Sequence, residues 1–153
     1  MIECGQNQVK NETLCREVYE SIVEKAKTGA VRTHDGEIVR FFSDNFDHAF
    51  RTSSDWCAQR YAKDKLDAER VIRARWIEPV ISGAVPRSAC WSIRDANRRQ
   101  TYRRMYLVWD ENYVVWLQPT DDGVWRFASA YRAWEREIRK YIDNGKEIWR
   151  RKD

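Results

Sequence analysis

Four short segments rich in aromatic and β-branched residues follow one another in the C-terminal half of the chain. They span residues 89–93, 102–109, 113–117 and 124–131, and such a composition is typical of β-strands. The links between them are short and turn-like, and a parallel pair would need a long crossover connection. The spacing therefore predicts a four-stranded antiparallel meander.

Helical patterns precede these strands. Apolar residues at three- and four-residue steps predict an amphipathic helix over residues 14–26, with Asn11 or Thr13 as its N-cap and Gly29 just after its end. The segment 34–36, His-Asp-Gly, is a favoured tight turn between two extended stretches. We therefore predict a helix followed by a short hairpin, with His34 at the turn.

Three more helical segments are predicted from caps and spacing. Ser43 or Asp44 can cap a short helix that runs through Phe50. Asp67 can cap a helix that we expect to extend to about Trp76. Proline is tolerated in the first turn of a helix, so residues 79–83 predict a short helix that ends at Ser82-Gly83.

A final helix is predicted from the apolar positions Trp134, Ile138, Tyr141 and Ile142, and it weakens at Asn144-Gly145. A chain of 153 residues is of the size of one domain. The fold class is therefore α+β, a single domain 1–153 in which N-terminal helices pack on a four-stranded antiparallel meander, with a C-terminal helix.

The charge is unevenly distributed. Residues 51–108 hold 13 basic and 6 acidic side chains, whereas residues 1–50 hold 6 basic and 9 acidic ones. Arginine supplies 20 of the 28 basic residues, and its planar guanidinium suits phosphate groups and stacks on bases. A polyanionic partner such as RNA is one reading of the basic middle third, and a solvated charged face is the other.

Several function classes lack their usual sequence supports. The chain has no Gly-rich phosphate loop, no paired metal-ligand motif and no serine elbow, so we predict neither a metal nor a cofactor. The four cysteines stand far apart, at Cys4, Cys15, Cys57 and Cys90. They predict reduced thiols in a cytoplasmic protein. The longest apolar runs, such as 113–117, are too short to span a membrane, so no membrane partner is expected.

One histidine lies just before the most basic stretch, in the segment Asp47-His48-Ala49-Phe50-Arg51. In a helix, His48 and Arg51 share a face. Histidine can take a proton from a 2′-hydroxyl or give one to a leaving oxygen, and arginine can hold a phosphate. The pair suits metal-free RNA cleavage, and a partly buried structural pair is the alternative.

Five short motifs follow one another along the chain: 47–51 (DHAFR), 65–72 (KLDAERVI), 75–81 (RWIEPVI), 113–117 (YVVWL) and 125–131 (WRFASAY). In this order they resemble the phage-associated branch of the barnase/EndoU/colicin/RelE-like (BECR) nucleases. Together they cover a family-like core of about residues 46–132. The last two motifs are similar to the final two strands of that branch.

The resemblance implies helices packed on a four-stranded antiparallel sheet, and RNA cleavage without a metal. It matches His48 to the histidine of the family's helix, Arg51 to the basic residue that follows, Ser129 to the hydroxyl residue of the last strand, and Tyr131 to the tyrosine beyond it. Ser129 departs from the commoner threonine but keeps a hydroxyl.

Strict alternation along the last strand places Trp125, Phe127, Ser129 and Tyr131 on one face. The two hydroxyl residues would then share that face with two large aromatic side chains. Those aromatics can stack on unpaired bases. For Trp125 and Phe127 we favour the alternative, in which they pack in the core.

The densest basic cluster is Arg98, Arg99, Arg103 and Arg104, with Tyr102 and Tyr106 interleaved. Together with Arg70 it is our predicted RNA-binding set. A regular strand directs only half of such a cluster to one surface. A charged edge that resists strand pairing explains the same residues.

These observations lead to the hypothesis of a metal-independent endoribonuclease of the phage, prophage or toxin type, which leaves a 2′,3′-cyclic phosphate. Its partners would be RNA, such as tRNA, and a protein inhibitor in the case of a toxin. The alternative is a catalytically inactive member of the fold that binds RNA or protein. A weaker third idea is ADP-ribosyl transfer, prompted by the segment 51–54 (RTSS).

Overall fold

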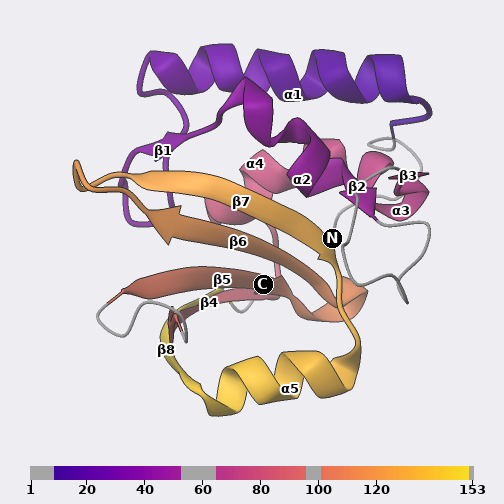
Figure 1. The fold of residues 1–153 in the computed structure, drawn as a ribbon. Helices are drawn as coiled ribbons and strands as arrows, with labels where there is room; N and C mark the ends of the chain where they lie inside the picture. Colours follow the sequence, from indigo (N-terminus) through magenta and orange to yellow (C-terminus); the bar gives the residue numbers. More distant parts are fainter. Residues whose placement is uncertain (1–8, 53–64, 96–100, 152–153) are drawn as a thin grey trace.

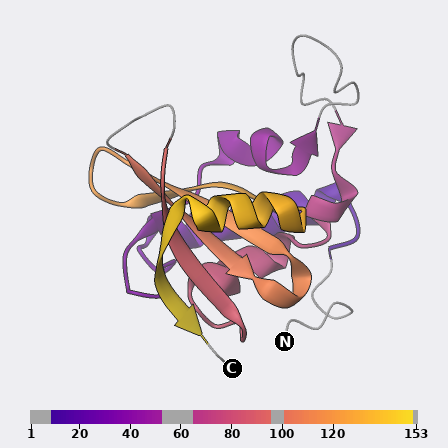
Figure 2. The same ribbon diagram turned by 90° about the horizontal axis from the view of Figure 1, so that it is seen from below.

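The computed structural model describes residues 9–52, 65–95 and 101–151. One long helix and several short ones lie on one face of a twisted mixed sheet, and a second long helix lies on the other face (Figure 1). Figure 2 shows that this second helix, α5, lies across the strands. The fold is therefore α+β, as the sequence predicts.

The helices of the described ranges are α1 (Glu12–Lys27), α2 (Phe46–Phe50), α3 (Ala68–Val71), α4 (Ile77–Ile81) and α5 (Glu135–Asp143), with the 3₁₀ turns η1 (Ser43–Asn45), η2 (Ala74–Trp76) and η3 (Trp109–Glu111). The strands are β1 (Val39–Arg40), β2 (Arg51–Thr52), β3 (Lys65–Leu66), β4 (Ser88–Arg94), β5 (Tyr102–Val108), β6 (Tyr113–Pro119), β7 (Trp125–Arg132) and β8 (Gly145–Arg151). None of these helices combines the length and the apolar character that crossing a membrane requires.

The main sheet has six strands in the order β1-β7-β6-β5-β4-β8. Strands β4 to β7 pair antiparallel with their neighbours in chain order. The predicted sheet of four strands is too small, because β1 adds to β7 in parallel and β8 adds to β4 in antiparallel orientation. β8 begins at Gly145, where the last predicted helix weakens, and it contains Ile148 and Trp149.

Local caps explain where the helices begin. The side chain of Asn11 accepts a hydrogen bond from the backbone N–H of Leu14 at 2.8 Å, and Gly29 takes a left-handed φ of 76° after α1. Asp67 caps α3 through the backbone N–H groups of Glu69 and Arg70. These caps agree with the sequence-based predictions.

The helix predicted from Asp67 to Trp76 is broken, because α3 ends at Val71. At Arg73 the side-chain Nη1, rather than the backbone N–H, donates to the carbonyl of Glu69 at 2.8 Å. The backbone N–H of Arg73 bonds to the carbonyl of Arg70 instead, in a tighter 3₁₀-type turn. The Arg73 side chain therefore occupies the Glu69 carbonyl, which the backbone of a continuing α-helix would use as its acceptor.

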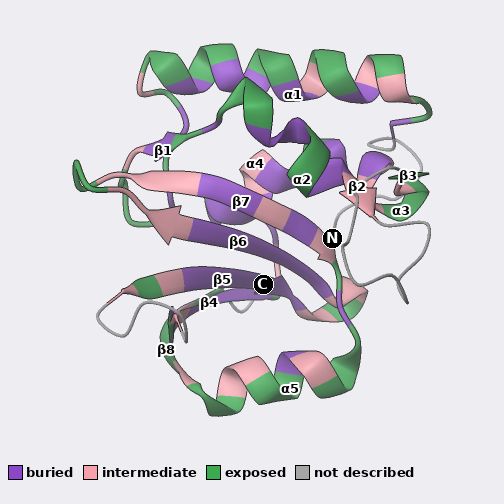
Figure 3. Ribbon diagram, viewed as in Figure 1, coloured by how far each residue is buried: buried purple, intermediate pink, exposed green. Residues whose placement is uncertain are grey.

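Two apolar cores lie on the two faces of the sheet, and Figure 3 shows the buried residues concentrated along the central strands. On the α1 face, the ring of Tyr19 makes edge contacts with Phe41, Phe46 and Phe50. On the α5 face, Trp116 and Ile138 belong to the second core. The short helix α2 thus owes its position to aromatic packing under α1.

A β-bulge in β7 changes which face its side chains occupy. Leu117 pairs with Phe127 and Trp116 pairs with Ser129, so Ala128 is the extra residue. Phe127 therefore packs in the core on the α1 face, whereas Ser129 lies on the α5 face beside Trp116. The predicted single face for 125, 127, 129 and 131 is wrong, because strict alternation fails at the bulge.

The bulge is fastened to the helical layer by one buried amide. Nδ2 of Asn45, the last residue of η1, donates to the carbonyls of Phe127 at 3.2 Å and Ala128 at 3.0 Å. Since α2 begins at the next residue, this amide ties the start of α2 directly to the bulge. Asn45 thus connects the elements that carry residue 48 and residue 129.

We expect Asn45→Ala to lower the free energy of unfolding by about 1–3 kcal/mol, because it removes the donor from two buried carbonyls. Asn45→Asp should lower the free energy of unfolding further, because it places a carboxylate against those same carbonyls. Urea unfolding measures both changes against Ser43→Ala, an exposed neighbour in η1. Asn45→Asp that is as stable as the wild-type protein would contradict this account of the bulge.

Candidate functional site

The pattern of apolar residues in α2 fixes the direction of His48. Phe46, Ala49 and Phe50 are buried at the i, i+3 and i+4 positions that share a helix face. Asp47 and His48 are exposed on the other side of the same helix. The packing of three neighbours therefore presents the imidazole at the surface.

His48 lines an open pocket of about 430 Å³ between α2, α3 and the end of β7. Its lining residues are His48, Arg70, Ser129, Tyr131, Arg132, Trp134 and Glu137. The structure thus places three of the four predicted catalytic residues, namely His48, Ser129 and Tyr131, around one pocket. It also places there Arg70, from the predicted RNA-binding set.

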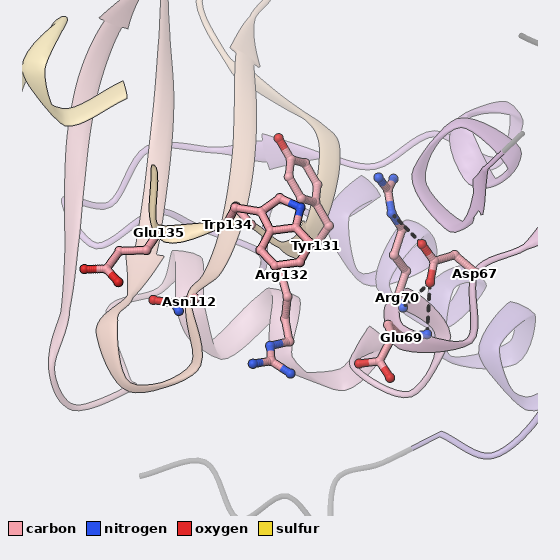
Figure 4. Close-up of a pocket in the computed structure, with 9 residues that line it drawn as sticks. Asp67, Glu69, Arg70, Asn112, Tyr131, Arg132, Trp134 and Glu135 are labelled. Carbon is pink, nitrogen blue, oxygen red and sulfur yellow. Dashed lines mark hydrogen bonds and ion pairs between the residues drawn. The ribbon is translucent and has the colours of Figure 1, made fainter. Parts of the chain in front are cut away.

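A larger pocket of about 660 Å³ adjoins the first and shares four of its residues. The shared residues are Arg70, Tyr131, Arg132 and Trp134. Figure 4 shows Trp134 and Tyr131 facing Asp67 and Arg70 across this pocket. The two pockets form one continuous surface, which we call the β7–α3 cleft.

Arg70 bridges three elements at the cleft. Its Nη1 donates to the carbonyl of Ala49 in α2 at 3.3 Å, and its guanidinium carbon lies 4.8 Å from the centre of the Tyr131 ring. Its Nε is 3.4 Å from the carboxylate of Asp67, the cap of α3. This side chain therefore holds α2, α3 and β7 together while it brings a positive charge to the pocket.

Tyr131 is held by its hydroxyl. Nε1 of Trp116 donates to that hydroxyl at 3.1 Å. Burial raises the pKa of Tyr131, and the hydrogen bond from Trp116 opposes this effect. The phenol therefore stays protonated near neutral pH and can donate a hydrogen bond.

Arg51 does not line the pocket. The helix ends at Phe50, and Arg51 continues in an extended conformation with φ −114° and ψ 152°. Its guanidinium bonds to Asp47 at 2.8 Å and to Glu12 at 2.7 Å. The predicted shared face of His48 and Arg51 is wrong, because the helix stops one residue too early and two carboxylates hold the arginine.

The predicted basic cluster is divided. Arg98 and Arg99 lie outside the described residues. Arg103 stacks on Trp116, with its guanidinium carbon 4.4 Å from the ring centre, and lines a separate cleft beside α5. Arg104 is buried on the opposite face, where it bonds to both carboxylate oxygens of Asp35 at 2.8 Å. The structure therefore gives Arg104 an internal ion pair, with no open surface for RNA.

The second histidine of the chain belongs to that internal network. Nδ1 of His34 lies 2.6 Å from the hydroxyl of Tyr106, and its ring stacks on Trp149 at 4.6 Å. Burial lowers the pKa of His34, while burial raises the pKa of the neighbouring Cys90 thiol to about 12. Both groups are neutral near pH 7, which fits a structural role.

Trp134, Arg132 and Glu137 are site residues that the sequence did not single out. Trp134 fits the apolar spacing of the last helix, yet 82% of its surface is exposed. It is the N-cap residue of α5 with an extended backbone, so it lies before the first helical turn and leaves the buried face. The spacing of apolar residues does not show that Trp134 is a cap residue with an extended backbone, so it does not predict that the side chain is exposed.

Within residues 9–52, 65–95 and 101–151, no group of three or more His, Cys, Asp and Glu side chains is placed to hold a metal ion. Comparison of the chain with protein families, with curated proteins and with solved structures finds no match.

The pH dependence of stability should report on His34. Its pKa lies below the ordinary 6.5 in the folded protein, so the unfolded chain takes up a proton first as the pH falls. We expect the free energy of unfolding to decrease between about pH 7 and pH 5. The Arg104 guanidinium holds the pKa of Asp35 below its usual 3.8, so that carboxylate loses its stabilising effect only in stronger acid.

His34→Gln should flatten this slope, because glutamine keeps a hydrogen-bonding group that does not titrate. Ser82→Ala, at an exposed position that does not titrate, is the control and should keep the wild-type slope. Equal slopes in His34→Gln and in the wild-type protein would show that another group is responsible.

Proposed function

We propose that the β7–α3 cleft is the active site of a metal-independent endoribonuclease. One observation supports this most: His48, Ser129 and Tyr131, which the resemblance to the BECR nucleases named as functional, line one pocket although they lie far apart in the chain. Arg70 adds a cation to the same pocket. The phage or toxin setting, the protein inhibitor and the cytoplasmic location stay predictions from the sequence.

In this proposal the 2′-hydroxyl oxygen of the RNA attacks the adjacent phosphorus, and the bond from phosphorus to the 5′-oxygen breaks. The imidazole of His48 accepts the proton of the 2′-hydroxyl. The hydroxyl of Tyr131 donates a proton to the leaving 5′-oxygen, and the imidazolium later returns a proton through solvent. The products are a 2′,3′-cyclic phosphate and a 5′-hydroxyl.

Arg70 takes the role that the sequence assigned to Arg51. Negative charge increases on the phosphate oxygens in the transition state, and a fixed guanidinium in a partly enclosed site stabilises it. The hydroxyl of Ser129 can donate a further hydrogen bond to the same phosphate. Arg51 is instead held by two carboxylates, those of Glu12 and Asp47, and does not line the pocket.

The second candidate function is RNA binding without cleavage. The pocket lining holds one imidazole, that of His48, whereas efficient cleavage needs both a base and an acid. Tyr131, the proposed acid, has its pKa raised by burial and is therefore a weaker acid. This observation favours the catalytically inactive alternative.

The test is incubation with total RNA and with tRNA in excess chelator. We expect His48→Ala to lower the cleavage rate by roughly 100- to 10,000-fold, the usual contribution of a general base. Arg70→Ala should lower it by roughly 100- to 1,000-fold. Arg51→Ala is the matched control and should stay within about threefold of the wild-type rate, because its ion pairs are partly exposed.

End-group analysis identifies the reaction, since the proposal requires 2′,3′-cyclic phosphate ends. Full activity in folded His48→Ala would refute the role of this residue. RNA that the wild-type protein binds with a steep salt dependence but leaves intact across a broad pH range would establish the binding function instead.

A further inference from the structure

Trp134 is exposed beyond what packing explains. It keeps 82% of its surface in solvent, more than the other exposed large hydrophobic residues of the described chain, Phe42, Tyr102 and Ile148. A tryptophan side chain normally buries a large area on folding, so an almost fully exposed indole contributes little to the core. Its surface is available to a ligand.

The indole stands at the junction of the two pockets that form the β7–α3 cleft. Trp134 lines both pockets, and the next residue begins α5. Figure 4 shows the ring beside Tyr131, on the opposite side of the pocket from Arg70. A flat ligand on this ring would therefore lie next to the pocket that holds His48.

One cation beside Trp134 is placed to contact an anionic ligand. Arg132 donates Nε to the backbone carbonyl of Glu111 at 3.1 Å and forms no ion pair within the described ranges. Three of the four cleft carboxylates have cationic partners: Asp67 with Arg70 at 3.4 Å, Glu69 with Arg73 at 2.8 Å, and Glu135 with Arg139 at 2.9 Å. The fourth, Glu137, accepts a hydrogen bond from the Tyr141 hydroxyl at 3.1 Å. Within the described residues, the guanidinium of Arg132 is thus not paired with a carboxylate and can contact an anionic group.

We propose that Trp134 stacks on one unpaired base of a single-stranded RNA, while Arg132 contacts a phosphate next to that base. This inference rests on the proposed function of the cleft, and it specifies the substrate class as single-stranded. A base within a duplex is already stacked on its neighbours, whereas a base in a loop or at an end is free to stack on an aromatic ring.

Binding to a short oligonucleotide with 2′-O-methyl groups tests stacking apart from cleavage, because such a strand lacks the attacking hydroxyl. We expect Trp134→Ala to weaken binding by roughly 5- to 150-fold in a fluorescence anisotropy titration. Trp134→Phe should recover part of the affinity. Tyr102→Ala removes another exposed aromatic ring, from the start of β5, and should bind like the wild-type protein.

Abasic sites identify the contact. Removing one base from the oligonucleotide should weaken binding to the wild-type protein at one position, and the same removal should have no further effect on Trp134→Ala. The same sequence in a perfect duplex should bind the wild-type protein more weakly than the single strand. These outcomes together distinguish a stacking site from a general loss of charge or fold.

The proposal is overturned if Trp134→Ala binds the single strand as tightly as Tyr102→Ala, or if duplex and single strand bind equally well. Failure of the proposed function looks different: unmodified RNA stays intact, yet Trp134→Ala still weakens binding of the methylated strand. Absence of any oligonucleotide binding to the wild-type protein at low salt would refute both, and would leave Trp134 as a contact for a protein partner.

Discussion

The placement of the cleft depends on one amide at the bulge of β7. An extra residue in a strand leaves local carbonyls without their usual partner on the neighbouring strand. The two protons of the Asn45 amide satisfy the carbonyls of Phe127 and of the extra residue Ala128, at the shift in register. A buried bulge would otherwise carry unpaired acceptors, which cost about 1–3 kcal/mol each. The sheet and the helical layer are thus joined where the strand changes face.

Because of the bulge at this junction, β7 directs large side chains to one face of the sheet before the bulge and to the other face after it. Phe127 stays in the core on the α1 face, stacked on Phe41 at 4.9 Å. After the bulge, Ser129 and Tyr131 belong to the α5 face and reach the cleft. A regular strand with Phe127 in that core would direct residues 129 and 131 into the same core. The cleft therefore requires the irregularity.

Local signals in the sequence predicted much of the fold, because they act within a few residues. The cap at Asp67, the glycine at 29 and the short links between the central strands need no distant partner. The bulge, the strand β8 and the burial of Arg104 depend on partners far away in the chain. The same limit applies to the site: nothing local distinguishes an arginine that reaches a pocket from one that a distant carboxylate holds.

His48 stands on a helix of only five residues, too short to persist without tertiary support. Beyond the amide of Asn45 at its start, its C-terminal carbonyls are held by the α3 region: Arg70 donates to Ala49, and the backbone N–H of Asp67 donates to Phe50 at 2.8 Å. Arg70 thus both carries charge into the cleft and fixes the helix that presents the imidazole. Arg70→Lys would keep the charge but not the planar fork that spans these contacts. Comparing its effect on KM with its effect on kcat would therefore separate the two roles of Arg70.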